Sequence, residues 1–218
     1  MARNKYPEET IRLILDVAQG LFLKKGYEDT SIQDIINGLG GLSKGAVYHH
    51  FKSKEEIFNA VGYRYNEQII SELKVVRDDP ALTGFAKLKK MFSLSLSSSD
   101  RDIVFTVAPN MLENPKLLAM QMREIFSDVV PHYVQPVIEQ GMADGSIQTE
   151  YPRELSEVII MLTNLWLNPL VLKTNVEYME KRVRFFNLML KNMGIELLDE
   201  QMVESYRRYC ALANQKSE

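Results

Sequence analysis

The segment 40–56, GGLSKGAVYHHFKSKEE, concentrates residue types that do chemistry in proteins. Its glycines could form a loop that cradles phosphate, its two histidines could ligate a metal ion, and its lysines attract anions. Three kinds of site therefore compete for this segment: a phosphate-binding loop of an enzyme, a metal site, and a helix that lies against an anionic partner.

The spacing of the glycines excludes two common phosphate-binding loops. A dinucleotide fingerprint that begins at Gly38 requires a third glycine where the chain has Ser43, and no strand pattern precedes it. A Walker loop that begins at Gly40 has Ala46 in the place of its lysine. The S-x-x-K pattern at 71–74 lacks the partner motifs of its enzyme class. We therefore expect no enzyme, neither here nor in the methionine-rich C-terminal half, and no cofactor.

The histidines are poorly spaced for a metal ion. His49 and His50 are adjacent, so on a helix their side chains diverge by a quarter turn or more. His132 lies far along the chain with no HxxxH or carboxylate pattern beside it. We expect no metal site.

The helix signals around the segment favour a helix-turn-helix. Apolar residues recur with helical period before Gly26. A glycine at this position suits the C-terminal end of a first helix. Thr30 or Ser31 can cap a second helix, Ser43 a third and Ser53 a fourth. The predicted helices are 7–25 or 10–25, a short one that ends at 38–41, a recognition helix at about 43–50, and one from Ser53 that continues for about six turns.

The helix 43–50 has a composition suited to the major groove of DNA. Its N-terminal amides and Lys44 favour phosphate, Gly45 lets the backbone approach the bases, and Ala46 is small enough to contact a thymine methyl group. Val47 and Phe51 are predicted to face inward. Polar tips that can reach DNA backbone oxygens on either flank belong to Tyr48, His49, Lys52 and Lys54.

The segments TIRLILDVAQGLFLKKGYEDTSIQDI and LSKGAVYHHFKSKEEIFNAV resemble the N-terminal domain of the TetR (tetracycline-repressor) family of transcriptional regulators. The resemblance covers about residues 10–62. It rests on Ala-x-x-Leu-Phe, on Gly-Tyr-x-x-Thr-Ser, and on the block Ser-Lys-Gly…Tyr-His…Phe-Lys-Ser-Lys. It implies an all-α protein, with a three-helix helix-turn-helix domain at 1–62 and a larger helical effector-binding and dimerisation domain at 63–218.

The resemblance also implies which residues contact DNA. The residues of the recognition helix would contact the operator, and Lys54 would bind phosphate at the start of the fourth helix. Thr30, Ser31 and Gln33 would bind phosphate at the second helix. The chain has one residue more than the common pattern in NGLGGLS, which bears on the angle of the recognition helix. The predicted DNA-binding residues are Thr30, Ser31, Gln33, Ser43, Lys44, Gly45, Ala46, Tyr48, His49, His50, Lys52 and Lys54.

The net charge of −3 does not by itself favour nucleic acid. Residues 1–64 carry nine Lys and Arg against eight Asp and Glu, whereas the remainder carries 17 against 21. A local cluster of positive charge can hold DNA on an acidic protein, so the distribution permits DNA binding. The longest uncharged stretch, 158–172, has 15 residues and is too short for the ~20 that span a bilayer, so we expect no membrane role.

After residue 78 the periodicity predicts helices at about 82–96, 101–108, 115–143, 152–172, 175–193 and 199–213. The 115–143 helix is expected to kink at Pro131 and Pro136. All methionines except Met1 lie after residue 90, which is compatible with a binding cavity as well as with an ordinary core. Candidate pocket residues are Phe92, Phe105, Met122, Phe126, Tyr133, Met161 and Trp166. The resemblance implies a dimer interface made mainly by the helices 152–172 and 175–193, where the candidate interface residues are Leu162, Leu165, Phe185, Phe186 and Met189.

These features together predict a cytoplasmic homodimeric repressor that binds a palindromic double-stranded DNA operator. A small-molecule effector would release it by moving the helix 54–76. The alternative is a helical protein-binding adaptor that keeps the helix-turn-helix fold without binding DNA. The single cysteine, Cys210, fits a reducing compartment.

Overall fold

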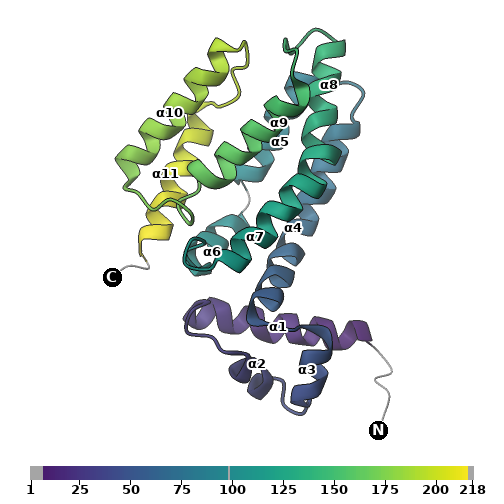
Figure 1. Ribbon diagram of the computed structural model, residues 1–218, viewed down its shortest axis with the longest axis vertical. Helices are drawn as coiled ribbons and strands as arrows, with labels where there is room; N and C mark the ends of the chain where they lie inside the picture. The colour runs from purple at the N-terminus through teal and green to yellow at the C-terminus, as the bar shows by residue number, and fades with distance from the viewer. Residues whose placement is uncertain (1–6, 98, 216–218) are drawn as a thin grey trace. The chain divides into compact units, whose positions relative to one another are not determined.

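The computed structural model describes residues 7–97 and 99–215, and over these residues the protein is all-α without a strand (Figure 1). The chain divides into two compact units. The N-terminal unit comprises Met1–Glu67 together with Val107–Pro109, and the C-terminal unit comprises Gln68–Thr106 and Asn110–Glu218. The position 62/63, which the sequence suggested as a boundary, lies inside helix α4 (Lys54–Asp78).

From residue 7 onward, where the structure describes it, the N-terminal unit contains three helices and the beginning of α4. Helix α1 has glutamates in its first turn and lysines in its last, as the helix dipole favours, and it ends before Gly26, whose φ is 79°. Ile14, Ala18 and Phe22 follow one another along the buried face of α1. The helices are α1 (Pro7–Lys25), α2 (Ile32–Gly38), α3 (Lys44–His50) and α4.

The C-terminal unit contains the end of α4 and the remaining helices, two of which are π-helical. In Figure 1, α5 runs beside α8 and α10 runs beside α11, and both pairs are in contact. The elements are α5 (Gly84–Ser97), α6 (Ser99–Val107), α7 (Pro115–Glu124), the π-helix η1 (Ile125–Val134), α8 (Gln135–Ala143), α9 (Pro152–Met161), the π-helix η2 (Leu162–Trp166), α10 (Val176–Asn192) and α11 (Glu200–Asn214).

Two differences from the predicted helices lie at prolines. The long helix 115–143 is continuous, but its middle is the π-helix η1, which contains Pro131. A π-helical turn is a known way for a helix to absorb a disrupted hydrogen-bond ladder. The helix predicted over 152–172 ends at Trp166, because Asn168 precedes Pro169 and the residue before a proline avoids helical geometry.

The N-terminus of α5 is fixed against the C-terminus of α8. A Cβ atom on Gly84 would lie 2.1 Å from the backbone nitrogen of Gly141, so the two backbones touch with no side chain between them. The amide of Gly84 donates to a carboxylate oxygen of Asp144 at 2.8 Å, and the amide of Phe85 donates to the hydroxyl of Ser146 at 3.0 Å. The turn after α8 therefore caps α5.

A buried lysine strengthens the same junction. Lys87 lies on α5, and its Nζ donates to the carbonyl of Arg77 and to Oε1 of Gln140, each at 2.6 Å. Arg77 in turn donates to the carbonyl of His132 at 2.9 Å. The buried ammonium of Lys87 thus has two acceptors, and its hydrogen bonds join the end of α4, the start of α5 and the end of α8.

Candidate nucleic-acid interface

The turn between α2 and α3 requires glycine at two positions. Gly40 and Gly41 have φ values of 61° and 150°, which lie in the region that L side chains rarely adopt. Ser43 then caps α3, and its hydroxyl accepts a hydrogen bond from the amide of Ala46 at 3.2 Å. The glycine-rich turn therefore ends in a well-formed helix start.

The first turn of α3 is exposed and its opposite side is buried. Ser43, Lys44 and Gly45 are exposed, whereas Val47 is 0% exposed and Phe51 is half-buried. A Cβ atom on Gly45 would meet nothing nearer than the Ser43 hydroxyl at 3.8 Å. Packing within the protein therefore does not require glycine at position 45, and the bare backbone there is available to a partner.

The aromatic side chains of α3 flank this exposed turn. Tyr48 is half-buried, and Nζ of Lys44 lies 5.7 Å from the centroid of its ring. The rings of His49 and His50 meet edge to face, with centroids 5.1 Å apart. Burial, followed by the nearby His49 and Lys52, lowers the pKa of His50 below its ordinary value. His50 is therefore neutral at neutral pH and can donate or accept a hydrogen bond.

The C-terminus of α3 is capped by the residue that follows Phe51. Nζ of Lys52 donates to the carbonyls of Tyr48 at 2.7 Å and His49 at 3.3 Å. The amide of Lys52 donates to a carboxylate oxygen of Glu56 at 2.7 Å. Lys52 is exposed, so its charge lies at the surface while it holds the end of the helix.

Helix α2 begins with a capping box made by Ser31 and Asp34. The amide of Asp34 donates to the Ser31 hydroxyl at 3.1 Å, and the Ser31 amide donates to the Asp34 carboxylate at 2.8 Å. The Ser31 hydroxyl also donates to that carboxylate, at 2.7 Å. This bond, then the bond from the Ser31 amide and then Lys25, whose Nζ lies 2.9 Å away, hold the pKa of Asp34 well below its usual range. Gln33 is exposed, and its amide nitrogen donates to Asn37 at 2.9 Å.

Two of the predicted phosphate contacts have other partners. Thr30 is 1% exposed, and its hydroxyl donates to the carbonyl of Gly26 at 2.7 Å, so burial removes its side chain from the surface. Nζ of Lys54 donates to the carbonyl of Tyr27 at 2.8 Å and to that of Glu28 at 3.3 Å. Neither contact could be predicted from residue types, because the acceptors are backbone carbonyls.

The predicted pocket residues of the C-terminal unit do not share one environment. Phe92, Phe105 and Tyr133 are buried, and Met122 and Trp166 are half-buried. The ring of Phe105 stacks on that of Tyr209 with centroids 4.4 Å apart. The two residues whose side chains lie at the surface, and so do not line an enclosed site, are Phe126 at 43% exposure and Met161 at 39%.

The predicted interface residues separate into exposed and buried ones. Phe185 is 54% exposed, whereas its neighbour Phe186 is 0% exposed and belongs to the core, which corrects the prediction for Phe186. Leu162, Leu165 and Met189 are half-buried. Three further large apolar residues are exposed and were not predicted as interface candidates: Val158, Tyr178 and Leu188. We define the apolar face as the group Val158, Met161, Leu165, Trp166, Tyr178, Phe185 and Leu188.

Two contacts connect η2 with α10 within this face. The rings of Trp166 and Phe185 meet edge to face at 6.1 Å. The guanidinium of Arg182 lies 5.9 Å from the Trp166 ring and 4.9 Å from the Tyr178 ring, and it donates to the carbonyl of Trp166 at 3.2 Å. Within the apolar face, which has residues on α9, η2 and α10, these contacts hold η2 and α10 together.

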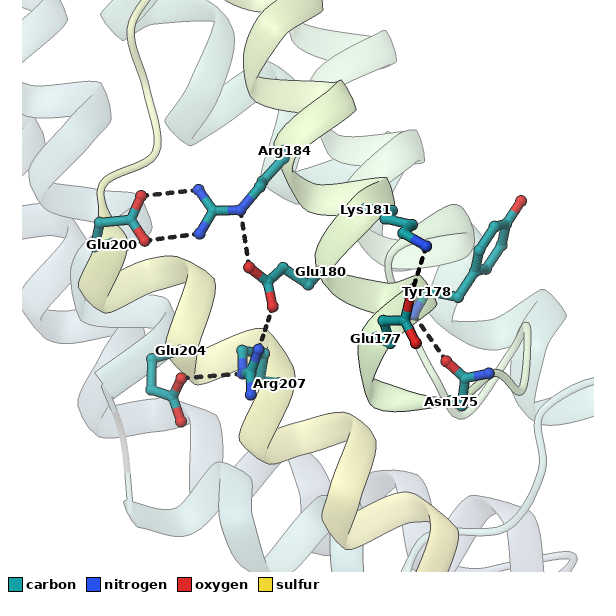
Figure 2. A network of polar contacts seen from close by, with 9 residues as sticks. All are labelled: Asn175, Glu177, Tyr178, Glu180, Lys181, Arg184, Glu200, Glu204 and Arg207. Atoms are coloured by element: carbon teal, nitrogen blue, oxygen red, sulfur yellow. Dashed lines mark hydrogen bonds and ion pairs between the residues drawn. The ribbon is translucent and has the colours of Figure 1, made fainter.

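Figure 2 shows a charged network that fixes α11 against α10 beside this surface. Arg184 on α10 donates to both carboxylate oxygens of Glu200 on α11, at 2.9 and 3.0 Å. Glu180 accepts from Arg184 at 2.9 Å and also from Arg207, which pairs with Glu204 at 3.2 Å. The bidentate geometry and the bridging carboxylate connect α10 with α11 at the surface.

The described part of the chain contains no group of three or more His, Cys, Asp or Glu side chains arranged to hold a metal ion. His132 instead lies beside Asp128, with Nδ1 3.1 Å from a carboxylate oxygen. Over the same residues, no helix has the length and apolar character needed to cross a membrane.

Comparisons with known proteins connect this geometry with regulators of transcription. Residues 14–61 match the family model of the bacterial regulatory proteins of the tetR family. The HTH-type transcriptional regulator AcrR of Shigella flexneri is 39% identical over 77 residues, which make up 34% of this chain and 35% of AcrR. The HTH-type transcriptional repressor KstR2 of Rhodococcus jostii (strain RHA1) is 27% identical over 146 residues, or 66% of this chain and 70% of KstR2.

For AcrR and a second relative above 30% identity, the matched segment spans less than half of the relative's length. A crystal structure of a protein described as a TetR/AcrR family member matches the fold more widely. It has a TM-score of 0.50 at 20% sequence identity and covers 93% of this chain and 99% of that chain. At this identity, the match concerns the fold alone.

Proposed function

We propose that this chain, whose residues 14–61 match the family model of the bacterial regulatory proteins of the tetR family, is a dimeric repressor of transcription of that family. In this proposal, the dimer binds a palindromic DNA operator in the cytoplasm, and a small-molecule effector releases it. KstR2, with which this chain shares 27% identity, is itself a transcriptional repressor. The proposal assigns no catalytic role to the protein.

The observation that carries the proposal is the first turn of α3, which is exposed and has only small residues after Lys44. Lys44 supplies positive charge, Gly45 leaves the backbone open, and Val47 anchors the opposite side of the helix in the core. A recognition helix enters the major groove with its N-terminal residues toward the base edges, so this arrangement suits that role.

The proposed contacts divide into base-reading and phosphate-binding residues. Gly45 and Ala46 would lie nearest the bases, because no long side chain separates the backbone from the groove. The exposed polar groups on either side would fix the position of α3 through the DNA backbone. We propose as DNA contacts Ser31, Gln33, Ser43, Lys44, Gly45, Ala46, Tyr48, His49, His50 and Lys52.

A second copy of the chain is the proposed occupant of the apolar face. Phe185, Tyr178 and Leu188 expose large apolar surface on one side of α10, and the charged network of Figure 2 holds that helix in place. A two-fold dimer buries the same face on both copies. It also supplies the two recognition helices, about 34–36 Å apart, that a palindromic operator requires.

Effector binding is proposed to act through α4, because this helix contributes residues to both units. In the N-terminal unit, Arg64 of α4 donates to Asp16 of α1 at 2.8 Å. In the C-terminal unit, Arg77 of α4 donates to the carbonyl of His132 on η1. A ligand among Phe92, Met122 and Tyr133 would change the second attachment and so bias the spacing of the recognition helices.

A binding experiment with selected DNA tests the proposal. Duplexes enriched from a random 30-base-pair library by the wild-type protein would be titrated by fluorescence anisotropy at several KCl concentrations. We expect nanomolar to micromolar binding that weakens steeply with salt, and weaker binding by Lys44→Ala. Lys90→Ala is the matched control, because Lys90 is an exposed lysine on α5 of the other unit. Failure to enrich any duplex would favour the adaptor function.

A further inference from the structure

Lys54 is half-buried, and its ammonium group contacts three groups of the N-terminal unit. Two of its N–H groups point to the carbonyls of Tyr27 and Glu28, at 2.8 and 3.3 Å. Its Nζ also lies 4.1 Å from the centroid of the Tyr27 ring, which is a close cation–π contact. Lys52 also donates to two carbonyls, but it is exposed, whereas Lys54 is half-buried and packs on an aromatic ring as well.

The acceptor side of this site is itself rigid. Tyr27 is buried, and its ring contacts those of Phe22 and Phe58 at centroid distances of 5.8 and 4.8 Å. The carbonyl of Tyr27 also accepts from the amide of Thr30 at 3.2 Å. Lys54 and Phe58 lie one turn apart on α4, so both hold the start of α4 against the connection between α1 and α2.

This attachment lies close to the recognition helix along the chain. Helix α3 ends at His50, and Lys54 is the first residue of α4. The short connection between them is held by Lys52, whose side chain caps α3 and whose amide donates to Glu56 of α4. The place where α3 ends is thereby fixed relative to the place where α2 begins.

We infer that Lys54 is a positioning residue for DNA recognition and that it does not bind phosphate. It fixes the start of α4, and with it the end of α3, by donating to two carbonyls of the α1–α2 connection. This inference rests on the proposed function as a DNA-binding regulator. Lys44 provides the contrast, because it is exposed and its Nζ lies 5.7 Å from the centroid of the Tyr48 ring.

The two roles differ in their salt dependence. Each phosphate contact by a lysine contributes about 0.9 to the slope of log affinity against log salt, because binding releases a counterion from DNA. Removing a phosphate contact therefore lowers the slope by about one. Removing a residue that orients the recognition helix lowers affinity at every salt concentration and leaves the slope unchanged.

The experiment compares Lys54→Met with Lys44→Met in the full chain. Operator affinity is measured at 10 °C with the selected 30-base-pair duplex over a range of KCl, after circular dichroism has shown that each variant is folded. For Lys54→Met we expect at least a tenfold loss of affinity, an unchanged slope, a lower Tm, and faster hydrogen exchange of amides in 27–31. For Lys44→Met we expect a lower slope and an unchanged Tm.

Lys54→Gln serves as a second variant, because its amide keeps an N–H donor but loses the charge. The positioning role predicts that it retains more affinity than Lys54→Met, with the wild-type slope. A slope that falls by about one in both variants, or an affinity that does not change, overturns the inference while DNA binding stands. If the wild-type protein enriches no duplex, the proposed function fails. The Tm and hydrogen exchange of Lys54→Met then decide whether the attachment exists: unchanged values overturn it.

Discussion

Two neighbouring phenylalanines on α10 are expected to respond oppositely to truncation. Phe185 is 54% exposed on the apolar face, whereas Phe186 is 0% exposed in the core. Phe185→Ala is expected to dissociate the proposed dimer and to leave the folded monomer nearly unchanged. Phe186→Ala is expected to destabilise the fold. The pair tests the interface because both changes remove the same atoms from the same helix.

The magnitudes follow from burial and symmetry. Truncating a fully buried phenylalanine costs about 3–5 kcal/mol, which is a large part of a typical stability of about 5–15 kcal/mol. In a two-fold dimer, Phe185→Ala removes one aromatic ring from each copy. An aromatic anchor contributes about 2 kcal/mol or more, so the loss is about 4 kcal/mol per dimer, and the dissociation constant rises about a thousandfold.

Sedimentation equilibrium over a wide range of protein concentration would measure the dissociation constant, and calorimetry would measure Tm. We expect Phe185→Ala to sediment as a monomer at concentrations where the wild-type protein is a dimer, with a similar monomer stability. For Phe186→Ala we expect Tm to fall by about 6–20 °C. A Phe185→Ala variant that remains as dimeric as the wild type would refute the assignment of the apolar face.

Two further predictions concern the N-terminal unit. Gly45→Ala is expected to leave the fold intact or to raise the free energy of unfolding by up to about 1 kcal/mol. It is also expected to weaken binding to the selected duplex about tenfold or more, because the added methyl group would lie between α3 and the bases. An equal affinity of the two proteins in fluorescence anisotropy would contradict this close approach. Asp34→Asn is expected to lower Tm at pH 7 and to reduce its pH dependence. The folded pKa of Asp34 lies below the value of about 3.9 in an unfolded chain, so its contribution is present above that pH and is lost as the pH falls below it. Thermal unfolding between pH 7 and pH 3 measures this, and parallel curves for the two proteins would show that the carboxylate does not contribute.

The helices of the N-terminal unit were predictable because their boundaries are set by local interactions. Ser43 caps α3 through an amide three residues away, and Ser31 and Asp34 cap α2 through each other. The glycine after α1 adopts the left-handed conformation that ends helices. Such signals need no knowledge of the rest of the molecule, and they also identified the exposed turn of α3.

The roles of single side chains were less predictable, because they depend on elements distant along the chain. Phe185 and Phe186 are equally apolar, and the packing around α10 decides which is buried. Lys54 is a residue type that commonly binds phosphate, but the acceptors of its ammonium group are backbone carbonyls more than 20 residues earlier along the chain. Thr30 is polar and yet buried, because a carbonyl of the preceding turn accepts from its hydroxyl. A sequence does not display backbone acceptors.

The bare contact between Gly84 and Gly141 has a mechanical consequence. Helices α5 and α8 are clamped at this end by the capping of Asp144 and by Lys87, with no compressible side-chain layer between the backbones. Two helices that are held together at one end can separate most at the other end. If the proposed effector enters the C-terminal unit, we expect it to displace α5 from α8 least at this end and most toward the far end of α5 and the π-helix η1 that precedes α8.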